Sequence, residues 1–169
     1  MNDLDWLNSL QPMQAMLELL KCCGSRSWAA RVAKSRPYAS IAELKDVAHN
    51  IWWSLDRDDW LEAFRSHPKI GERKAEIEGT VQAQAWSEQE QSGVDESTES
   101  AKEELAGLNR EYEAKFGYIF IVCATGKSSE EMLEILRERI QNEPNDELRV
   151  AAGEQAKITE LRLARLLSL

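Results

Sequence analysis

The sequence predicts an all-α protein, and three observations support this class. Apolar residues recur every three or four positions along most of the chain, and capping residues precede several of these segments. One continuous apolar run, at 118–124, is short enough for a strand, but no second strand is evident to pair with it. We therefore expect one domain over residues 1–169, a bundle of roughly seven to eight helices with a buried extended segment near 118–124.

Turn and capping residues delimit four helices in the first part of the chain. Pro12 fits the first turn of the first helix, because its missing N–H group needs no partner there. Ser40 and Glu43 have the spacing of a capping box, and Pro68 disfavours helical geometry at His67. The four expected helices lie at 12–24, from Ser25 or Ser27 to 36, at 40–55 and at 56–66.

The second part of the chain predicts three further helices and a less regular region. Residues 68–86 contain breaks at glycine and suggest a loop with a short helix at 73–77. Ser87 and Glu90 have capping-box spacing, so they favour a helix N-terminus at Ser87. Long amphipathic segments then predict helices that end at Gly117, that span 128–141, and that run from Pro144 to the C-terminus.

Composition excludes several classes of function. The net charge of −9 opposes binding to nucleic acid and to anionic membranes, and no segment has the length or composition of a membrane span or a signal peptide. The three cysteines form no readable disulfide framework, and the two histidines lack metal-ligand spacing. We therefore expect a cytoplasmic protein with no metal, no nucleic-acid partner and no membrane partner.

Two histidines differ in what their positions predict. His67 precedes Pro68 at the end of a predicted helix, where a side chain can project into a loop, and imidazole is the natural acid or base at neutral pH. A surface or capping role for His67 stays open on these features alone. His49 lies within an amphipathic helix, and there a structural or solvent-facing role is favoured.

Three other features have both a structural and a functional interpretation. The N–H groups of a helix starting at Ser87 can bind an anion, with Glu90 and Gln91 beside it, although capping alone explains the pattern. The peptide groups of 118–124 can face a ligand, although a core role is favoured, and Cys123 there suits a buried hydrophobe. Arg162 can clamp a carboxylate, or it can be a solvated arginine.

Taken in order, the motifs resemble those of one family. They are His67-Pro68-x-Ile70-Gly71, Ser87-x-x-Glu90-Gln91-x-Gly93, Leu108-Asn109-x-x-Tyr112-x-x-Lys115-Phe116-Gly117-Tyr118-x-Phe120-Ile121-Val122-Cys123-Ala124, and Lys157-Ile158-x-x-x-Arg162-Leu163. This order and spacing is similar to that of the 2-oxo-4-hydroxy-4-carboxy-5-ureidoimidazoline (OHCU) decarboxylases of urate degradation.

The resemblance implies a cofactor-free, all-α lyase, commonly a homodimer, that converts OHCU to (S)-allantoin and carbon dioxide. It implies His67, Glu90 and Arg162 as catalytic residues. It implies that the substrate is bound by Pro68, Ser87, Glu90, Gln91, Phe120, Ile121, Val122, Cys123, Ala124 and Arg162, with backbone groups acting in 120–124. Two other functions stay open: a non-enzymatic helical binding module, and a lyase acting on a related ureide.

Overall fold

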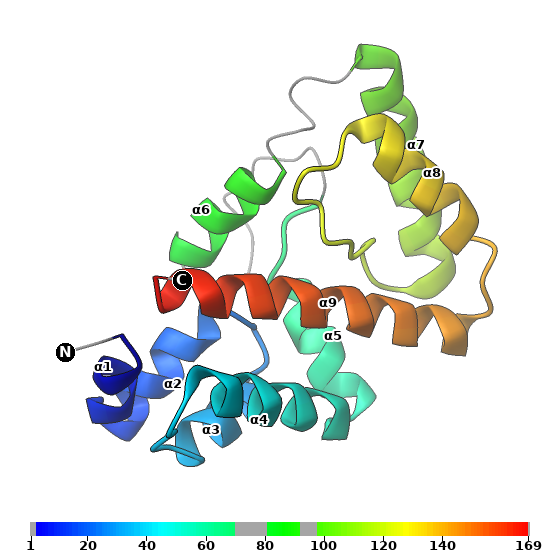
Figure 1. Ribbon diagram of the computed structural model, residues 1–169. Helices are drawn as coiled ribbons and strands as arrows, with labels where there is room; N and C mark the ends of the chain where they lie inside the picture. Colours follow the sequence, from blue (N-terminus) through cyan, green and yellow to red (C-terminus); the bar gives the residue numbers. More distant parts are fainter. Residues whose placement is uncertain (1–2, 70–80, 92–97, 169) are drawn as a thin grey trace. The chain divides into compact units, whose positions relative to one another are not determined.

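The computed structural model describes residues 3–69, 81–91 and 98–168, and within these it contains nine α-helices and no β-strand (Figure 1). The helices are α1 (Asp3–Ser9), α2 (Pro12–Leu20), α3 (Arg26–Lys34), α4 (Ile41–Ser54), α5 (Arg57–Arg65), α6 (Val81–Glu90), α7 (Glu99–Phe116), α8 (Ser129–Arg139) and α9 (Pro144–Leu166). The all-α prediction is confirmed. None of these helices is long and apolar enough to cross a membrane.

Local sequence sets most helix ends as predicted. The Ser25 hydroxyl accepts the Trp28 N–H at 3.2 Å and caps α3, and Ser128 forms a capping box with Glu131 at the start of α8. Gly117 ends α7 with φ of 83°, a left-handed conformation that favours glycine. These caps explain why the sequence pattern alone predicts the starts of α3 and α8 well.

Two helices differ from the sequence prediction. The acidic segment of α1 was not predicted as a helix. It accounts for part of the difference between the nine helices of the described residues and the seven to eight helices expected. Helix α6 begins at Val81, so the predicted helix start at Ser87 is wrong. The short helix expected at 73–77 lies outside the described residues.

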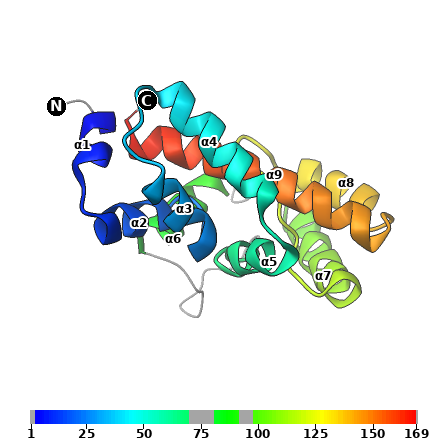
Figure 2. The same cartoon turned by 90° about the horizontal axis from the view of Figure 1, so that it is seen from below.

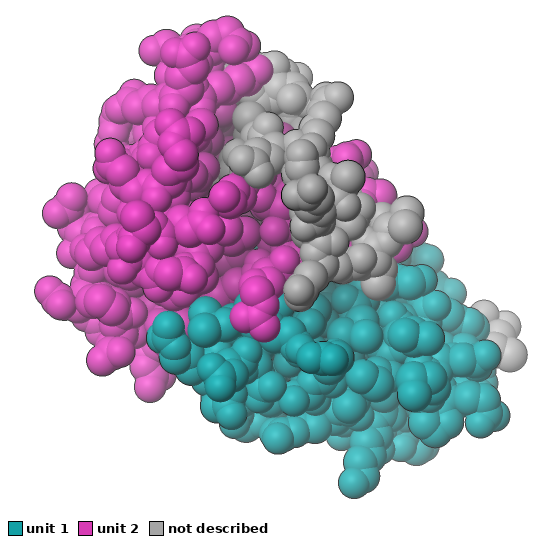
Figure 3. All heavy atoms as spheres, turned by 180° about the vertical axis from the view of Figure 1, so that it is seen from behind, with its two compact units in different colours: residues 1–63, 156–169 teal, residues 64–155 magenta. Residues whose placement is uncertain are grey.

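The chain divides into two compact units (Figure 3). Unit 1 comprises residues 1–63 and 156–169, and in it α2 packs against α3 and α3 against α4 (Figure 2). Its core includes Trp28, whose indole N–H donates to the Ala48 carbonyl at 3.0 Å. Trp52 is buried while Trp53 is exposed, as expected for adjacent residues of one helix.

Unit 2 comprises residues 64–155, and in it α7 packs against α8. The Tyr112 ring lies 4.6 Å from that of Phe116 and 5.4 Å from that of Phe120, measured between centroids. Residues 118–124 have no regular secondary structure, and five of these seven residues are buried. This confirms the buried non-helical segment that the sequence predicts.

Candidate active site

His67 lies just beyond the end of α5, where Pro68 was expected to place it. Helix α5 ends at Arg65, and the His67 N–H donates to the Phe64 carbonyl at 3.2 Å. The side chain is partly buried, so it is not a fully solvated surface histidine. Both His67 and Pro68 belong to unit 2.

Gln155, which the sequence analysis did not single out, contacts the His67 ring. The Nε2 atom of His67 lies 2.6 Å from Oε1 of Gln155, and Gln155 is fully buried. His67 follows the end of α5 and Gln155 lies on α9, 88 positions further along the chain, so no local pattern predicts the contact. A polar side chain on the apolar face of the last helix, seven residues before Arg162, was the available signal.

The Ser87–Gln91 motif lies at the C-terminal end of α6, not at a helix start. The Ser87 hydroxyl donates to the Ala83 carbonyl at 3.0 Å, a bond within the helix, and the Gln91 N–H donates to the Ser87 carbonyl at 3.1 Å. A helix C-terminus presents carbonyl groups, so the expectation of an anion site formed by N–H groups is wrong. Carbonyls and a carboxylate instead suit a ligand that donates N–H groups.

Glu90 is the last residue of α6 and is only 8% exposed. A carboxylate at the negative end of a helix is electrostatically unfavourable, by about 0.3–1 kcal/mol where it is exposed. Burial is the main cause that raises the pKa of the Cys123 thiol; Lys127 lowers this pKa, and Glu154 and Glu90 raise it by less than burial does. Glu90 and the 118–124 segment belong to the same unit.

Several peptide groups of 118–124 are already bound within unit 2. The Arg139 guanidinium donates to the Ile121 carbonyl at 2.7 Å, and Lys127 Nζ donates to the Cys123 carbonyl at 2.8 Å. The Cys123 N–H donates to Glu154 at 3.3 Å. Within the described residues, the peptide groups of Val122 take part in no hydrogen bond, and Val122 is buried. Such groups are costly to bury without a partner, which favours a ligand there.

A buried polar network supports this segment from behind, and sequence reasoning missed it. Glu147, fully buried, forms an ion pair with Arg139 at 2.6 Å and accepts from the Tyr112 hydroxyl at 2.5 Å and from Asn142 at 2.9 Å. Burial is the main cause that raises the pKa of Tyr112. The neighbouring Glu147 raises this pKa further, while Arg139 lowers it. Tyr112 is therefore a neutral donor, and Arg139 links Glu147 to Ile121.

Arg162 belongs to unit 1, in the last turns of α9, and is 1% exposed. Its charge lowers the pKa of Cys22, against the larger effect of burial, which raises it. Burial likewise raises the pKa of Cys23 to about 12. The solvated alternative for Arg162 is therefore wrong, since its guanidinium is buried.

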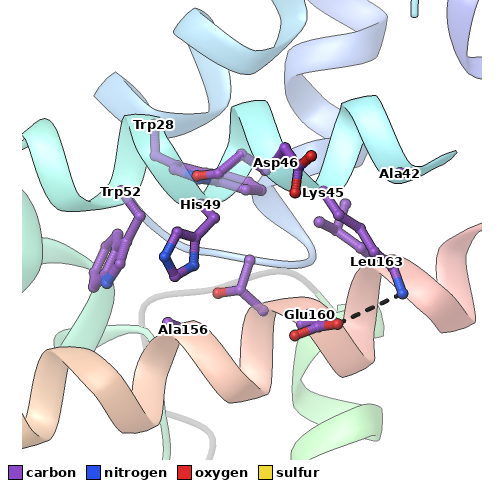
Figure 4. A pocket seen from close by; sticks show the side chains of 11 residues that line it. Trp28, Ala42, Lys45, Asp46, His49, Trp52, Ala156, Glu160 and Leu163 are labelled. Carbon is purple, nitrogen blue, oxygen red and sulfur yellow. Dashed lines mark hydrogen bonds and ion pairs between the residues drawn. The ribbon is translucent and has the colours of Figure 1, made fainter. Parts of the chain in front are cut away.

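Unit 1 also contains a hollow of about 410 Å³ between α4 and α9 (Figure 4). Lys45 and Glu160 form an ion pair at 3.6 Å beside it, and His49 points from α4 toward α9. The buried Trp28 of α3 also lines it. None of the predicted site residues lines this hollow, and His49 is solvent-facing, as favoured from the sequence.

These features define an all-α protein with a candidate active site. The structure is an all-α protein in which a histidine, a helix-terminal carboxylate and a buried irregular segment belong to one unit. Among the described residues, no group of three or more His, Cys, Asp or Glu side chains has the arrangement of a metal site.

Comparison with known proteins identifies the family. A sequence model of the OHCU decarboxylases matches residues 8–164, so the chain belongs to the OHCU decarboxylase family. It is 42% identical over 148 residues to the "Uric acid degradation bifunctional protein TTL" of Arabidopsis thaliana, covering 87% of this chain and 45% of that protein. The chain therefore spans less than half the length of that bifunctional relative.

A second relative and a solved structure agree with this family. The chain is 32% identical over 137 residues to 2-oxo-4-hydroxy-4-carboxy-5-ureidoimidazoline decarboxylase of Xenopus laevis, covering 81% of this chain and 78% of the relative. It matches a crystal structure of OHCU decarboxylase in the presence of (S)-allantoin with a TM-score of 0.77 and 42% identity, over 90% of this chain and 98% of that one. The likeness thus extends over most of the chain.

Proposed function

We propose that this protein decarboxylates OHCU, giving (S)-allantoin and carbon dioxide in urate and purine breakdown, without a cofactor. Membership of the OHCU decarboxylase family is the observation that carries the proposal. The placement of His67 supports it, because an imidazole at a helix end, beside a buried amide, is suited to proton transfer.

The substrate's chemistry explains why a few side chains suffice. When the carboxylate leaves as carbon dioxide, the electron pair of the broken C–C bond passes to the adjacent imine, so the substrate is its own electron sink. The hydroxyl on the ring carbon then loses its proton to become a carbonyl, while the former imine nitrogen and the ureido-bearing carbon each gain one, so that one proton is taken up overall. The protein must therefore remove one proton, orient the ring and deliver a proton to one face.

Each of these tasks has a candidate residue. His67 takes the hydroxyl proton, and Pro68 contacts the substrate beside it. Glu90, Ser87 and Gln91 bind the N–H groups of the ureido chain, which suits the acceptor-rich end of α6. Backbone groups of residues 120–124 bind the ring amides, and the peptide groups of the buried residues Phe120 and Val122 suit this role, because they form no hydrogen bond within the described residues.

Arg162 is proposed to hold an anionic or carbonyl oxygen of the substrate. Gln155 and Arg162 are seven residues apart on α9, so they project from one face of that helix. A guanidinium can hold an oxygen with two parallel hydrogen bonds. Residues 1–169 are proposed to act as one functional domain.

Glu90→Gln is expected to lower kcat/KM by about tenfold, since a hydrogen bond to a charged acceptor is worth about 1.5–3 kcal/mol. The melting temperature is expected to stay the same or rise, because the change removes a negative charge from the C-terminus of α6. Steady-state kinetics and thermal unfolding of the same sample check both effects.

Glu88→Gln is the matched control, because Glu88 lies on the same helix and is exposed. It should leave kcat/KM unchanged, and its melting temperature should also stay the same or rise, because Glu88 lies in the same last turn of α6. An activity loss in Glu90→Gln that merely follows a fall in melting temperature would assign Glu90 a structural role instead.

A substrate panel separates this function from its two rivals. A binding module would bind OHCU or allantoin without speeding the decay of OHCU, and a lyase for a related ureide would prefer another member of the panel. Decay of freshly generated OHCU, followed by absorbance with and without protein, is expected to accelerate in proportion to protein concentration. If no member of the panel reacted faster with the protein than without it, the result would support the binding module.

We also propose that the protein is a homodimer in the cytoplasm. Met13 and Leu17 support self-association, because they are 66% and 52% exposed and lie one turn apart on α2. Sedimentation equilibrium is expected to give twice the chain mass of 19.3 kDa. A single species at the monomer mass would contradict this.

A further inference from the structure

The side chain of Gln155 determines how the His67 ring is held. Its Oε1 atom lies 2.6 Å from His67 Nε2, and Gln155 itself is 0% exposed. An amide oxygen can only accept a hydrogen bond, so with the Gln155 amide in this orientation a neutral His67 ring pairs with it by carrying its proton on Nε2. The contact thus orients the imidazole and favours one tautomer over the other.

Local structure makes Gln155 a rigid partner. A helical side chain lies over the preceding turn, and the residues three and four positions before Gln155 are Ala152 and Ala151, both fully buried. Their small side chains leave room for the glutamine to extend along α9. On the other side of the contact, Pro68 restricts the backbone of His67, and the His67 N–H is bound to Phe64.

We infer that Gln155 is a positioning residue that keeps the proton of neutral His67 on Nε2, so that Nδ1 is the nitrogen that takes the substrate's hydroxyl proton. This inference rests on the proposed function. In the step, which follows the loss of carbon dioxide, the O–H bond of the resulting enol breaks and a new N–H bond forms at Nδ1. The oxygen becomes a carbonyl, and the C=C electron pair of the enol takes up a proton at the ureido-bearing carbon. Gln155 does not touch the reacting atoms and acts only through His67.

A neutral amide suits this task better than a carboxylate would. A carboxylate beside an imidazole stabilises the protonated ring and raises the imidazole pKa, whereas a base must be unprotonated to act. An amide oxygen fixes the tautomer without adding a charge. The opposite amide orientation would present the Gln155 NH₂ group to Nε2 and require the proton on Nδ1, so the two arrangements predict opposite tautomers.

The chain suits a direct test, because it has only two histidines. Long-range ¹H–¹⁵N NMR spectra, recorded above the pH at which the rings titrate, distinguish the two neutral tautomers, and His67→Asn assigns the signals. In the wild-type protein we expect His67 to be in the Nε2–H form. His49, which is exposed, serves as the internal reference.

Gln155→Met removes the acceptor with little change in side-chain length. We expect it to abolish the tautomer preference of His67 and to lower kcat by about tenfold or more, with a smaller change in KM, because general-base catalysis depends on the correctly oriented nitrogen. Gln155→Glu keeps an acceptor, so it should retain the Nε2–H form and move the acidic limb of the pH–kcat profile to higher pH. Gln141→Met, the same change at an exposed glutamine of unit 2, should alter none of these.

The NMR readout needs no substrate, so it separates this inference from the proposed function. An Nδ1–H tautomer in the wild-type protein, or a tautomer unchanged by Gln155→Met, would overturn the inference even if the protein decarboxylates OHCU. The expected tautomer with no turnover of OHCU would leave the His67–Gln155 arrangement in place but reject the proton transfer assigned to Nδ1.

Discussion

His67→Asn is expected to reduce kcat for OHCU by about 10²- to 10⁴-fold, the usual contribution of general acid–base catalysis. The physical reason is that asparagine cannot accept the hydroxyl proton at neutral pH, although its amide can still form hydrogen bonds. His67 lies beyond the end of α5 and is only partly buried, so the fold should survive. Kinetics with freshly generated OHCU, together with a thermal unfolding curve, measure both quantities.

His49→Asn provides the control for this change, because His49 is the other histidine and is exposed on α4. It should turn over OHCU at the wild-type rate. If His67→Asn also did so while remaining folded, the acid–base assignment would be wrong.

Arg139→Met is expected to lower the free energy of unfolding by about 3–5 kcal/mol, the usual effect of removing one partner of a buried ion pair. The change leaves the Glu147 carboxylate, which is 0% exposed, without its guanidinium partner. It also removes the donor to the Ile121 carbonyl, so activity should fall through a loosened 118–124 segment. Urea unfolding of the variant gives the free energy.

Two further variants separate the buried pair from a general effect of arginine. Arg137 lies on the same helix as Arg139 but is exposed, and its ion pair with Glu104 is a surface contact. Arg137→Met should therefore lower the free energy of unfolding only slightly. The double variant Arg139→Met with Glu147→Leu removes both charges and should regain part of the lost stability. Equal losses in Arg139→Met and Arg137→Met would contradict the role given to the pair.

Local signals were sufficient for much of the fold. Helices α3 and α8 were predictable because Ser25 and Ser128 bond to N–H groups three positions away, an interaction that the sequence displays directly. The end of α5 was predictable from Pro68. The buried 118–124 segment followed from its length and its lack of a pairing strand.

Helix α6 shows where the same signals mislead. Ser87 and Glu90 have the spacing of a capping box, but Ser87 donates back to Ala83 inside a helix that began six residues earlier. The spacing cannot distinguish a helix start from a helix interior when no strong apolar period marks the turn before it. The error reversed the predicted chemistry, from N–H donors to carbonyl and carboxylate acceptors.

The parts of the candidate site that sequence reasoning missed depend on contacts between distant residues. Gln155 reaches His67 across 88 positions, and Glu147 reaches Tyr112 across 35. Gln155 and Glu147 are polar residues of α9, a helix that carries many other polar and charged side chains. Their burial distinguishes them from solvent-facing residues, and the spacing of Gln155 from Arg162 is the one local signal.

Circular dichroism of the product tests the central claim most directly. Freshly generated OHCU is mixed with the wild-type protein, and the optical activity of the allantoin formed is followed over time. We predict a dichroic signal of (S)-allantoin that grows at a rate proportional to protein concentration and that His67→Asn reduces to the level of the protein-free reaction. Product without enantiomeric excess, formed at the protein-free rate, would contradict the assignment of this chain as an OHCU decarboxylase.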